Sequence, residues 1–425
     1  MKTETKKRFV KDMNLPIQVT QEPYFSYYMA LYDQDLGTME KYRMLQDAVE
    51  KCGSEEAFLQ EYYNVRDRVI RETKEVPAYQ DFLEADMSAY AFKAPELPDA
   101  YKTDVYKPQN VGQKFISLDM KQANYQVLRM FSKDIVFGTD MYEEYISRYT
   151  NLEYMRQSKY LRQVIFGNMN PKRQTTIQKH CMKQVFDLLV QEYGIPLEAF
   201  AVFTFDEIVL RHGRLDPKTA KRVEEKAEEE ILERLGIRIA VKPFTLKNIG
   251  GKDFYVNEMD DGTVKFKKVP SIYFPQVYKE YRSIPLEEKD FVFFHEGFLA
   301  RFMEPVFDLF QPGGLVICRS SQQESDFNIY ARVIHADRKE NKLVLDKYVC
   351  YGKLCAFRSR EIMSYSEGML YYDPMSRREA QSFCEGLKQN TVKDDMLAET
   401  LRIAEEFARG RLLQDHIPYT GKKEE

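Results

Sequence analysis

Residues 199–212 read AFAVFTFDEIVLRH, two apolar runs that flank the adjacent acids Asp206 and Glu207. Each run has the length and apolar content of a buried strand, so the stretch predicts a β-hairpin with both acids at its turn. Neighbouring carboxylates repel each other and resist removal from water, so something must offset the cost of this placement. The alternative, on these residues alone, is an exposed turn, where Asp is common.

The segments around this hairpin change type in an informative order. The elements expected in chain order are a strand 114–119, a helix 121–131, a helix 173–193, the hairpin, a helix 217–235 and a strand 237–244. This succession favours an antiparallel sheet with helices on one face, a ferredoxin-like α+β unit, over a doubly wound parallel sheet. In such a unit the first strand lies beside the hairpin. We therefore expect Asp119, at the end of the first strand, beside Asp206.

The flanking regions have different patterns. Residues 1–110 predict a helical N-terminal accessory region, with Ser54 before Glu55 as one helix start, and the prolines of 94–110 indicate a boundary. Residues 251–375 are rich in short strand patterns, typical of a small barrel or curled sheet. Residues 376–425 return to helix and end in a charged tail. The chemistry is therefore expected in the core, 111–250.

Bulk composition limits the function classes. The chain has 425 residues, 44% hydrophobic and 31% charged, which favours two or three globular domains. A net charge of −4 leaves nucleic-acid contact to a local basic patch. The charged start and the lack of a long apolar stretch predict a cytoplasmic protein without membrane contact. Six scattered cysteines, without a CxxC pair, are interpreted as core thiols in a reducing compartment (Cys52, Cys181, Cys318, Cys350, Cys355 and Cys384).

A basic segment precedes the hairpin. Residues 148–179 carry seven Lys or Arg against one acid, Glu153. Arg156, Lys159 and Arg162 recur every three residues, so one helix would align them on a face that leads to Phe166. Such a face suits a triphosphate or a nucleic-acid backbone, with the ring available to a base. A merely solvated basic face is the alternative.

Two carboxylates from separate strands, with a third nearby, are typical ligands for a hard divalent cation such as Mg²⁺ or Mn²⁺. With a nucleoside triphosphate present, a pair of such ions activates the attacking hydroxyl and stabilises the leaving pyrophosphate. A metal would also offset the repulsion between Asp206 and Glu207. Asp119 and Asp206 are the metal ligands that this hypothesis requires.

Together these residues resemble the core motifs of right-hand palm polymerases, most nearly family A DNA polymerases. DMKQANYQVL (119–128) is similar to the first motif, with Asp119 in the metal-binding place and Gln122 matching. RQVIFG (162–167) looks like the fingers-helix motif, which implies Arg162 on the triphosphate and Phe166 on the base. FDE (205–207) resembles the third motif, which implies Asp206 as the second metal ligand.

Departures from that family are clear. Asn124 stands where family A carries a Glu that helps exclude ribonucleotides, so the sugar preference is open. Phe205 replaces a His, and Asn170 stands at the place of a Tyr. The short gap from Phe166 to the hairpin, and the order Asp-Met-Lys at 119–121, are closer to reverse transcriptases. The chain resembles a divergent palm polymerase.

The resemblance implies a Mg²⁺- or Mn²⁺-dependent nucleotidyltransferase that extends a DNA or RNA primer-template from nucleoside triphosphates, as in a mobile element, phage or defence system. Its catalytic residues would be Asp119, Asp206 and Glu207. Substrate binding is expected from six residues: Lys159, Arg162, Phe166, Gln122, Asn124 and Arg156. In this interpretation 111–250 is the palm and fingers core, and 251–375 a thumb-like or nucleic-acid-binding domain. The alternatives are a non-catalytic nucleic-acid-binding scaffold with a palm fold and a template-independent terminal transferase.

Overall fold

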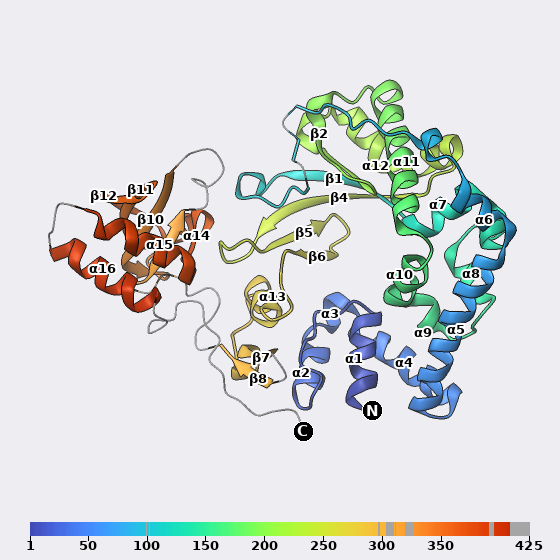
Figure 1. Cartoon of the computed structure of the whole chain (residues 1–425), viewed down its shortest axis with the longest axis horizontal. Helices are drawn as coiled ribbons and strands as arrows, with labels where there is room; N and C mark the ends of the chain where they lie inside the picture. The colour runs from blue at the N-terminus through green and yellow to red at the C-terminus, as the bar shows by residue number, and fades with distance from the viewer. Residues whose placement is uncertain are drawn as a thin grey trace. The chain divides into compact units, whose positions relative to one another are not determined.

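The protein is described by a computed structural model over residues 1–98, 100–101, 103–295, 298–302, 310, 312–318, 327–390 and 395–408. These residues form two compact units (Figure 1). Unit 1 comprises Met1–Tyr106, Asn110–Lys247 and Asn257–Lys265, and unit 2 comprises Lys107–Gln109, Asn248–Val256 and the chain from Phe266 onward. The boundaries expected near residues 110, 250 and 375 stay predictions, and the expected charged tail lies outside the described residues.

Helices make up the N-terminal part of unit 1, in agreement with the sequence pattern. They are α1 (Thr3–Asp12), α2 (Tyr24–Leu31), α3 (Asp33–Leu36), α4 (Thr38–Cys52), α5 (Glu55–Glu75), α6 (Pro77–Glu84) and the 3₁₀ turn η1 (Met87–Tyr90). A further 3₁₀ turn, η2 (Pro108–Asn110), lies mostly in the short segment of unit 2. The expected start of α5 is confirmed, because the Ser54 hydroxyl accepts a hydrogen bond from the Ala57 amide at 3.1 Å.

A six-stranded sheet follows, with the strand order β2-β3-β1-β4-β5-β6 (Figure 1). Its strands are β1 (Lys114–Met120), β2 (Phe200–Phe203), β3 (Glu207–Arg211), β4 (Ile239–Asn248), β5 (Tyr255–Met259) and β6 (Val264–Lys267). β1 pairs antiparallel with both β3 and β4, and β2 pairs antiparallel with β3. The expected mixed α+β class with an antiparallel sheet is confirmed, and the first strand does lie beside the hairpin.

The remaining helical segments of unit 1 connect these strands. They are α7 (Ala123–Phe131), η3 (Lys133–Val136), α8 (Tyr142–Ser147), α9 (Glu153–Gln157), α10 (Lys159–Gly167), α11 (Pro171–Glu192), η4 (Leu197–Ala199), η5 (His212–Arg214) and α12 (Pro217–Leu235). The bounds of α12 are those expected. Asp216 accepts hydrogen bonds from two amides of its first turn, and Gly236 ends it with φ of 67°.

The two faces of β1 differ in character because side chains alternate along a strand. Ile116, Leu118 and Met120 are buried on one face. Ser117 and Asp119 lie on the other face, and this is the face on which the acids of the hairpin are found. Phe115, at the start of this second face, is also buried, so the polar part of the face is the end that carries Ser117 and Asp119.

Unit 2 contains a second antiparallel sheet with the order β12-β11-β10-β9-β13, and a separate hairpin of β7 and β8. Its elements are α13 (Phe274–Arg282), η6 (Glu288–Phe291), β7 (Val292–His295), β8 (Phe298–Arg301), β9 (Leu315–Cys318), β10 (Phe327–Asp337), β11 (Lys342–Tyr351), β12 (Leu354–Ser364), α14 (Tyr365–Tyr371), β13 (Tyr372–Pro374), α15 (Arg377–Lys388) and α16 (Asp395–Ala408). The described strands form an open sheet rather than a closed barrel. In the described part of the chain no helix is both long enough and apolar enough to cross a membrane.

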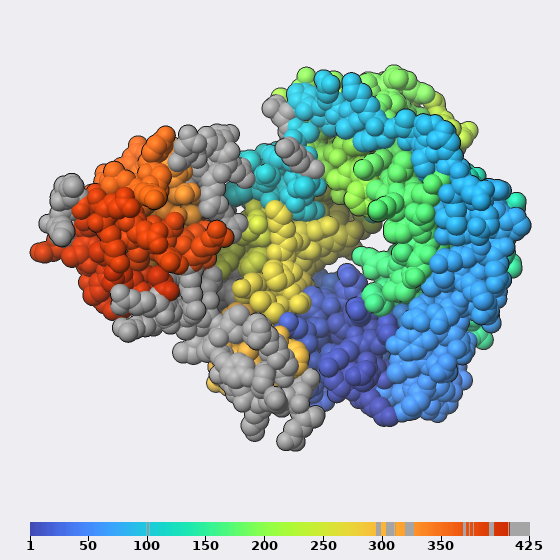
Figure 2. Space-filling view, in the orientation of Figure 1, coloured from blue at the N-terminus to red at the C-terminus, as the bar shows by residue number. Residues whose placement is uncertain are grey.

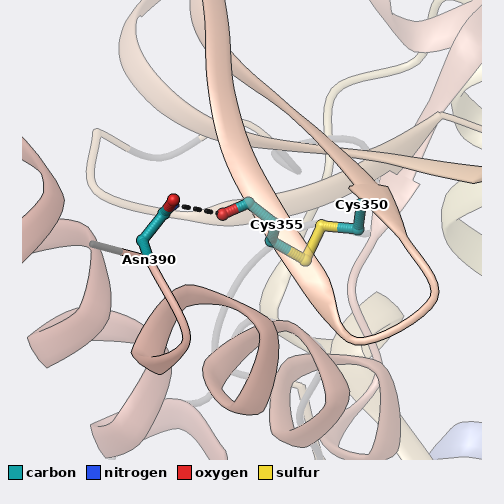
Figure 3. Close-up of a disulfide and its surroundings, with 3 residues drawn as sticks. All are labelled: Cys350, Cys355 and Asn390. Carbon is teal, nitrogen blue, oxygen red and sulfur yellow. Dashed lines mark hydrogen bonds between the residues drawn. A yellow bond between two sulfur atoms is a disulfide. The ribbon is translucent and has the colours of Figure 1, made fainter. Parts of the chain in front are cut away.

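The expectation of six free cysteines is wrong for one pair. Cys350 and Cys355 form a disulfide across the turn between β11 and β12 (Figure 3). They are direct partners in the strand register, so the hairpin itself brings them together. The side-chain amide of Asn390 donates a hydrogen bond to the Cys355 carbonyl. The sequence pattern missed the pair because only the turn position, not a CxxC spacing, places these two residues opposite each other.

Candidate active site

The structure brings Asp119 and the hairpin acids together. Asp119 on β1 pairs directly with Glu207 on β3, so the two side chains share one face of the sheet. Asp206 precedes Glu207 at the turn, and its carbonyl accepts a hydrogen bond from the Met120 amide at 2.8 Å. The end of β1 is therefore fixed against the turn that carries the other two acids.

Thr204 shapes this turn. Its amide donates to the Glu207 carbonyl at 2.9 Å, and its hydroxyl accepts from the Glu207 amide at 3.1 Å. The same hydroxyl lies 3.3 Å from a carboxylate oxygen of Asp206. Phe205, between them, is 46% exposed. The turn thus places an aromatic ring in solvent while it holds Asp206 beside β1.

Burial and like charge act together on Asp119. Burial raises the pKa of its carboxyl, and the negative charges of Glu207 and Asp206 raise it further, to about 6. Burial also raises the pKa of Asp206, which the hydrogen bond from Thr204 opposes. Carboxylates that destabilise one another in a partly buried place are typical of functional sites.

Two lysines face this cluster. The charges of Lys242 on β4 and Lys265 on β6 lower the pKa of Asp119, against the larger effects of burial and repulsion. Lys242 pairs in register with Ser117, two residues before Asp119, and therefore lies on the same face of the sheet. We had not expected Lys242 from the sequence. Side chains alternate between the two faces along β4, so the register of β4 with β1 would have placed Lys242 beside the acids.

Ser117 is a second residue that the sequence pattern did not reveal. Its hydroxyl donates to a carboxylate oxygen of Glu207 at 2.6 Å, and the residue is 7% exposed. A charged acceptor strengthens such a hydrogen bond. Ser117 therefore orients Glu207 on the polar face of the sheet.

The donor set suits a hard divalent cation. Asp119 and Asp206 offer carboxylate oxygens, which Mg²⁺ prefers, and a cation between them would relieve the repulsion that raises the pKa of Asp119. Within the described residues, no group of three or more His, Cys, Asp or Glu side chains is arranged to hold a metal. Mg²⁺ sites often have only one or two carboxylates, with substrate phosphates as further ligands. The acids here fit that kind of site.

The expected basic helix face is interrupted. α9 ends at Gln157 and α10 begins at Lys159, because Ser158 adopts an extended conformation and caps α10 by accepting from the Leu161 amide. Arg156 is thus on a different helix from Lys159 and Arg162, and it forms an ion pair with Glu153. The prediction of one continuous face with all three cations is wrong. The signal for the break was Ser158, a good helix cap inside the basic run.

Phe166 does not fit its expected role. Its ring is 1% exposed and packs among Tyr125, Tyr142 and Tyr145, with centroid separations of 6.2, 6.0 and 6.2 Å. A ring enclosed in an aromatic cluster is unavailable to an incoming base in this conformation. On the same helix, the Arg162 guanidinium lies 5.3 Å from the Tyr142 ring, and Lys159 is exposed.

The side-chain amides of Gln122 and Asn124, predicted to bind substrate, form hydrogen bonds within the protein. Gln122 donates to a carboxylate oxygen of Glu143 at 2.6 Å, and Asn124 accepts from the side-chain amide of Gln178 at 2.6 Å. Asn124 is therefore tied to α11. A role for either residue in substrate binding requires these hydrogen bonds to be exchanged, so both stay predictions.

The strand-rich region offers less nucleic-acid surface than its composition suggests. Tyr330 and Tyr348, two of the aromatic residues among the cations of its strands, are buried in the core of unit 2. Arg332 and Arg360 both pair with the buried Asp346. These tyrosines and arginines therefore stabilise the sheet itself.

Comparison of the chain with protein-family models, with curated proteins and with solved structures gave no match. Any function assigned to the cluster of Asp119, Asp206 and Glu207 thus rests on its geometry, its charge and the resemblance of its motifs.

Proposed function

We propose that the protein is a metal-dependent nucleotidyltransferase that extends a nucleic-acid strand from nucleoside triphosphates. One observation carries the proposal: Asp119 lies directly opposite Glu207 across paired strands, with Asp206 at the adjoining turn. Asp119 and the adjacent pair Asp206 and Glu207 come from two separate parts of the chain. Burial raises the pKa of Asp119, and the negative charges of the pair raise it further. A purely structural sheet gains nothing from such an arrangement.

The topology supports a ferredoxin-like palm. The strand order β2-β3-β1-β4, with helices between β1 and β2 and between β3 and β4, is the order expected for such a unit. In palm polymerases the acids stand at the end of the first strand and at the central hairpin, as Asp119 and Asp206 do here. The order of the motifs and the order of the strands therefore favour the same fold.

The residues take distinct roles in this proposal. Asp119 and Asp206 would hold the divalent ions, which supply activation of the attacking hydroxyl and stabilisation of the leaving pyrophosphate when bound. Glu207, oriented by Ser117, adds negative charge beside them. Lys242 faces the acids from β4 and would attract the anionic triphosphate.

The test is strand extension by the purified protein with Mg²⁺ or Mn²⁺. Each labelled nucleoside triphosphate is supplied with primed and unprimed DNA and RNA. We expect extended product from the wild-type protein and a loss of about a thousandfold or more in Asp119→Asn and Asp206→Asn, because metal-held charge stabilisation contributes several kcal/mol to such reactions. Asp187→Asn, a partly exposed acid of α11 that pairs with Lys183, is the matched control and should retain activity.

Two outcomes would favour the alternatives. Untemplated products of one or a few nucleotides indicate a terminal transferase. Absence of product with every substrate, while nucleic acid still binds, indicates a non-catalytic scaffold, for which the burial of Phe166 is the observation in favour. Equal activity in the Asp119→Asn protein and the wild type would contradict the assignment of the site.

A further inference from the structure

A buried carboxylate connects the N-terminal helices to α10. Asp12 at the end of α1 is 0% exposed and accepts hydrogen bonds from the hydroxyls of Tyr62 at 2.7 Å and Tyr154 at 2.8 Å. Ser158, the cap of α10, donates a third. These hydrogen bonds join the helices that contribute to them, although burial still raises the pKa of the Asp12 carboxyl. α1, α5, α9 and α10 therefore form one rigid scaffold.

This scaffold presents alternating cations and rings, which we call the Tyr160 surface: Arg8, Lys11, Tyr63, Arg66, Lys159 and Tyr160. The Lys11 ammonium lies 4.5 Å from the centre of the Tyr160 ring, and the Arg8 guanidinium lies 5.6 Å from it. Arg8 also lies 5.3 Å from the Tyr63 ring, which has Arg66 at 4.9 Å. Helices α1 and α5 both contact α10. Figure 2 shows the blue N-terminal helices meeting the green α9–α10 region.

Positive charge on this surface is incompletely balanced. In the described part of the chain, neither Lys11 nor Lys159 has an ion pair, although both are exposed. Other lysines of unit 1, such as Lys121 and Lys183, do pair with carboxylates. Arg66 pairs with its neighbour Asp67 and contributes less net charge. The Lys11 ammonium beside the Tyr160 ring, and the exposed Lys159 ammonium at the start of α10, are therefore left for an external anion.

Stability alone does not account for the pattern. Cation–π contacts at exposed sites stabilise a protein only slightly, and the scaffold is already fixed by Asp12. The Arg8 guanidinium donates one N–H group to the Tyr63 hydroxyl at 2.6 Å and lies over the rings of Tyr62, Tyr63 and Tyr160, and its planar fork carries further N–H donors. A guanidinium held in this way is prepared to bind a phosphate.

We propose that the Tyr160 surface binds single-stranded nucleic acid. Lys11, Lys159 and Arg8 contact successive phosphates, and bases stack on Tyr160 or Tyr63. This combination of a cationic track with aromatic platforms is the usual basis of sequence-tolerant single-strand binding. The choice of partner rests on the proposed function, but the binding itself needs no metal and no catalysis. The surface would hold a strand on the N-terminal helices, away from the acids of β1 and β3.

The test measures the fluorescence anisotropy of labelled single strands of about 20 nucleotides, in DNA and RNA form, from about 50 to 200 mM KCl. Lys11→Gln with Lys159→Gln should lower the slope of log affinity against log salt by about 1.4, since each phosphate contact on a single strand contributes about 0.7. Tyr160→Leu should weaken binding about fivefold or more with the slope unchanged. Tyr160→Phe, which keeps the ring, should bind like wild type.

A matched control removes the same charge elsewhere. Lys218→Gln with Lys221→Gln on α12 should leave affinity and slope unchanged. Thermal unfolding of each variant shows whether it is folded. The proposal is overturned if wild type binds no single strand at about 50 mM salt, if the Lys11 and Lys159 changes have no effect, or if Tyr160→Leu and Tyr160→Phe bind alike. Equal affinity for duplex also overturns it.

Failure here is distinguishable from failure of the proposed function. Asp119→Asn should bind single strands with wild-type affinity. If the protein extends strands, but substitutions on the Tyr160 surface leave its affinity for single strands unchanged, only this inference is contradicted. Binding that depends on Lys11 and Tyr160, without any extension, would remove only the enzymatic proposal.

Discussion

Two buried or partly buried aspartates occupy equivalent places in the two sheets. Asp346 on β11 lies between Arg332 on β10 and Arg360 on β12, which are its direct partners in the strand register. Asp119 on β1 lies between Glu207 on β3 and Ala240 on β4. The chain surrounds one carboxylate with cations and places the other beside a second acid.

The two carboxylates differ in how their charge is compensated. Asp346 is 0% exposed and accepts from Arg360 at 2.7 and 3.0 Å, a bidentate geometry that fixes three strands together. Asp119 has no such partner across the sheet, and its pKa rises to about 6. An arrangement that lowers stability persists where it serves a site, so the comparison supports a functional role for the sheet of unit 1.

The largest expected effect is the loss of stability when the Asp346 carboxylate is removed from its two arginine partners. Asp346→Asn keeps the shape of the side chain but leaves Arg332 and Arg360 without their carboxylate. Removal of one member of a buried ion pair is strongly destabilising, so we expect a loss of about 3 kcal/mol or more in the free energy of unfolding. Urea unfolding followed by circular dichroism measures it. An unchanged midpoint would mean that the arginines are satisfied by water.

The second largest loss of stability is expected from removal of the disulfide. Cys350 and Cys355 close a short loop in the same sheet (Figure 3). Closing such a loop restricts the unfolded chain, which corresponds to about 2 kcal/mol. Cys350→Ser with Cys355→Ser should lose that amount in urea unfolding, while addition of a reductant to the variant changes nothing further. Full stability in the double variant would contradict a structural role for the bond.

A smaller effect of opposite sign is expected at Asp119. Its raised pKa means that the folded protein holds the proton more tightly than the unfolded chain does, so the contribution of Asp119 to stability is complete at about pH 4 and below and is lost as pH rises through about 6. Asp119→Asn removes this loss. Because Asp119 is partly exposed to solvent, we expect a gain of only about 1–2 kcal/mol at pH 8 and almost none at pH 4.

The Asp119 measurement has an internal control. Asp187→Asn, at a partly exposed acid, should show no comparable gain at pH 8. Destabilisation by Asp119→Asn at pH 8 would show that the carboxylate is satisfied after all, and the contrast with Asp346 would then disappear.

Much of unit 1 was predictable because local signals and the global fold agree. Asp216 and Gly236 mark the ends of α12, and the short apolar run that ends at Asp119 indicates the strand β1. Segment order then placed Asp119 beside the hairpin. Ser158 is a local signal for the break in the basic helix, whereas the enclosure of Phe166 by tyrosines depends on tertiary packing and could not be read from the sequence.

The same limit explains which site residues were missed. Lys242 and Ser117 become neighbours of the acids only through the register of β1 with β4 and β3. A one-residue shift of that register would have moved them to the opposite face. In the second sheet, register likewise decides that Arg332 and Arg360 meet Asp346 rather than solvent.

The smallest expected effect tests how the acids of β1 and β3 are held. Ser117→Ala removes the hydroxyl that donates to Glu207 at 2.6 Å, at a position that tolerates a methyl group. We expect a loss of about 1 kcal/mol in unfolding, since a hydrogen bond to a partly solvated carboxylate is replaced by water. In an active enzyme the same change should lower kcat while KM for the triphosphate stays constant, because Glu207 would be less well oriented beside the metal ligands. Ser117→Thr, which keeps the hydroxyl and suits a strand, should restore both quantities. If Ser117→Ala and Ser117→Thr behave alike, Glu207 is positioned by the turn through Thr204 and not by the neighbouring strand.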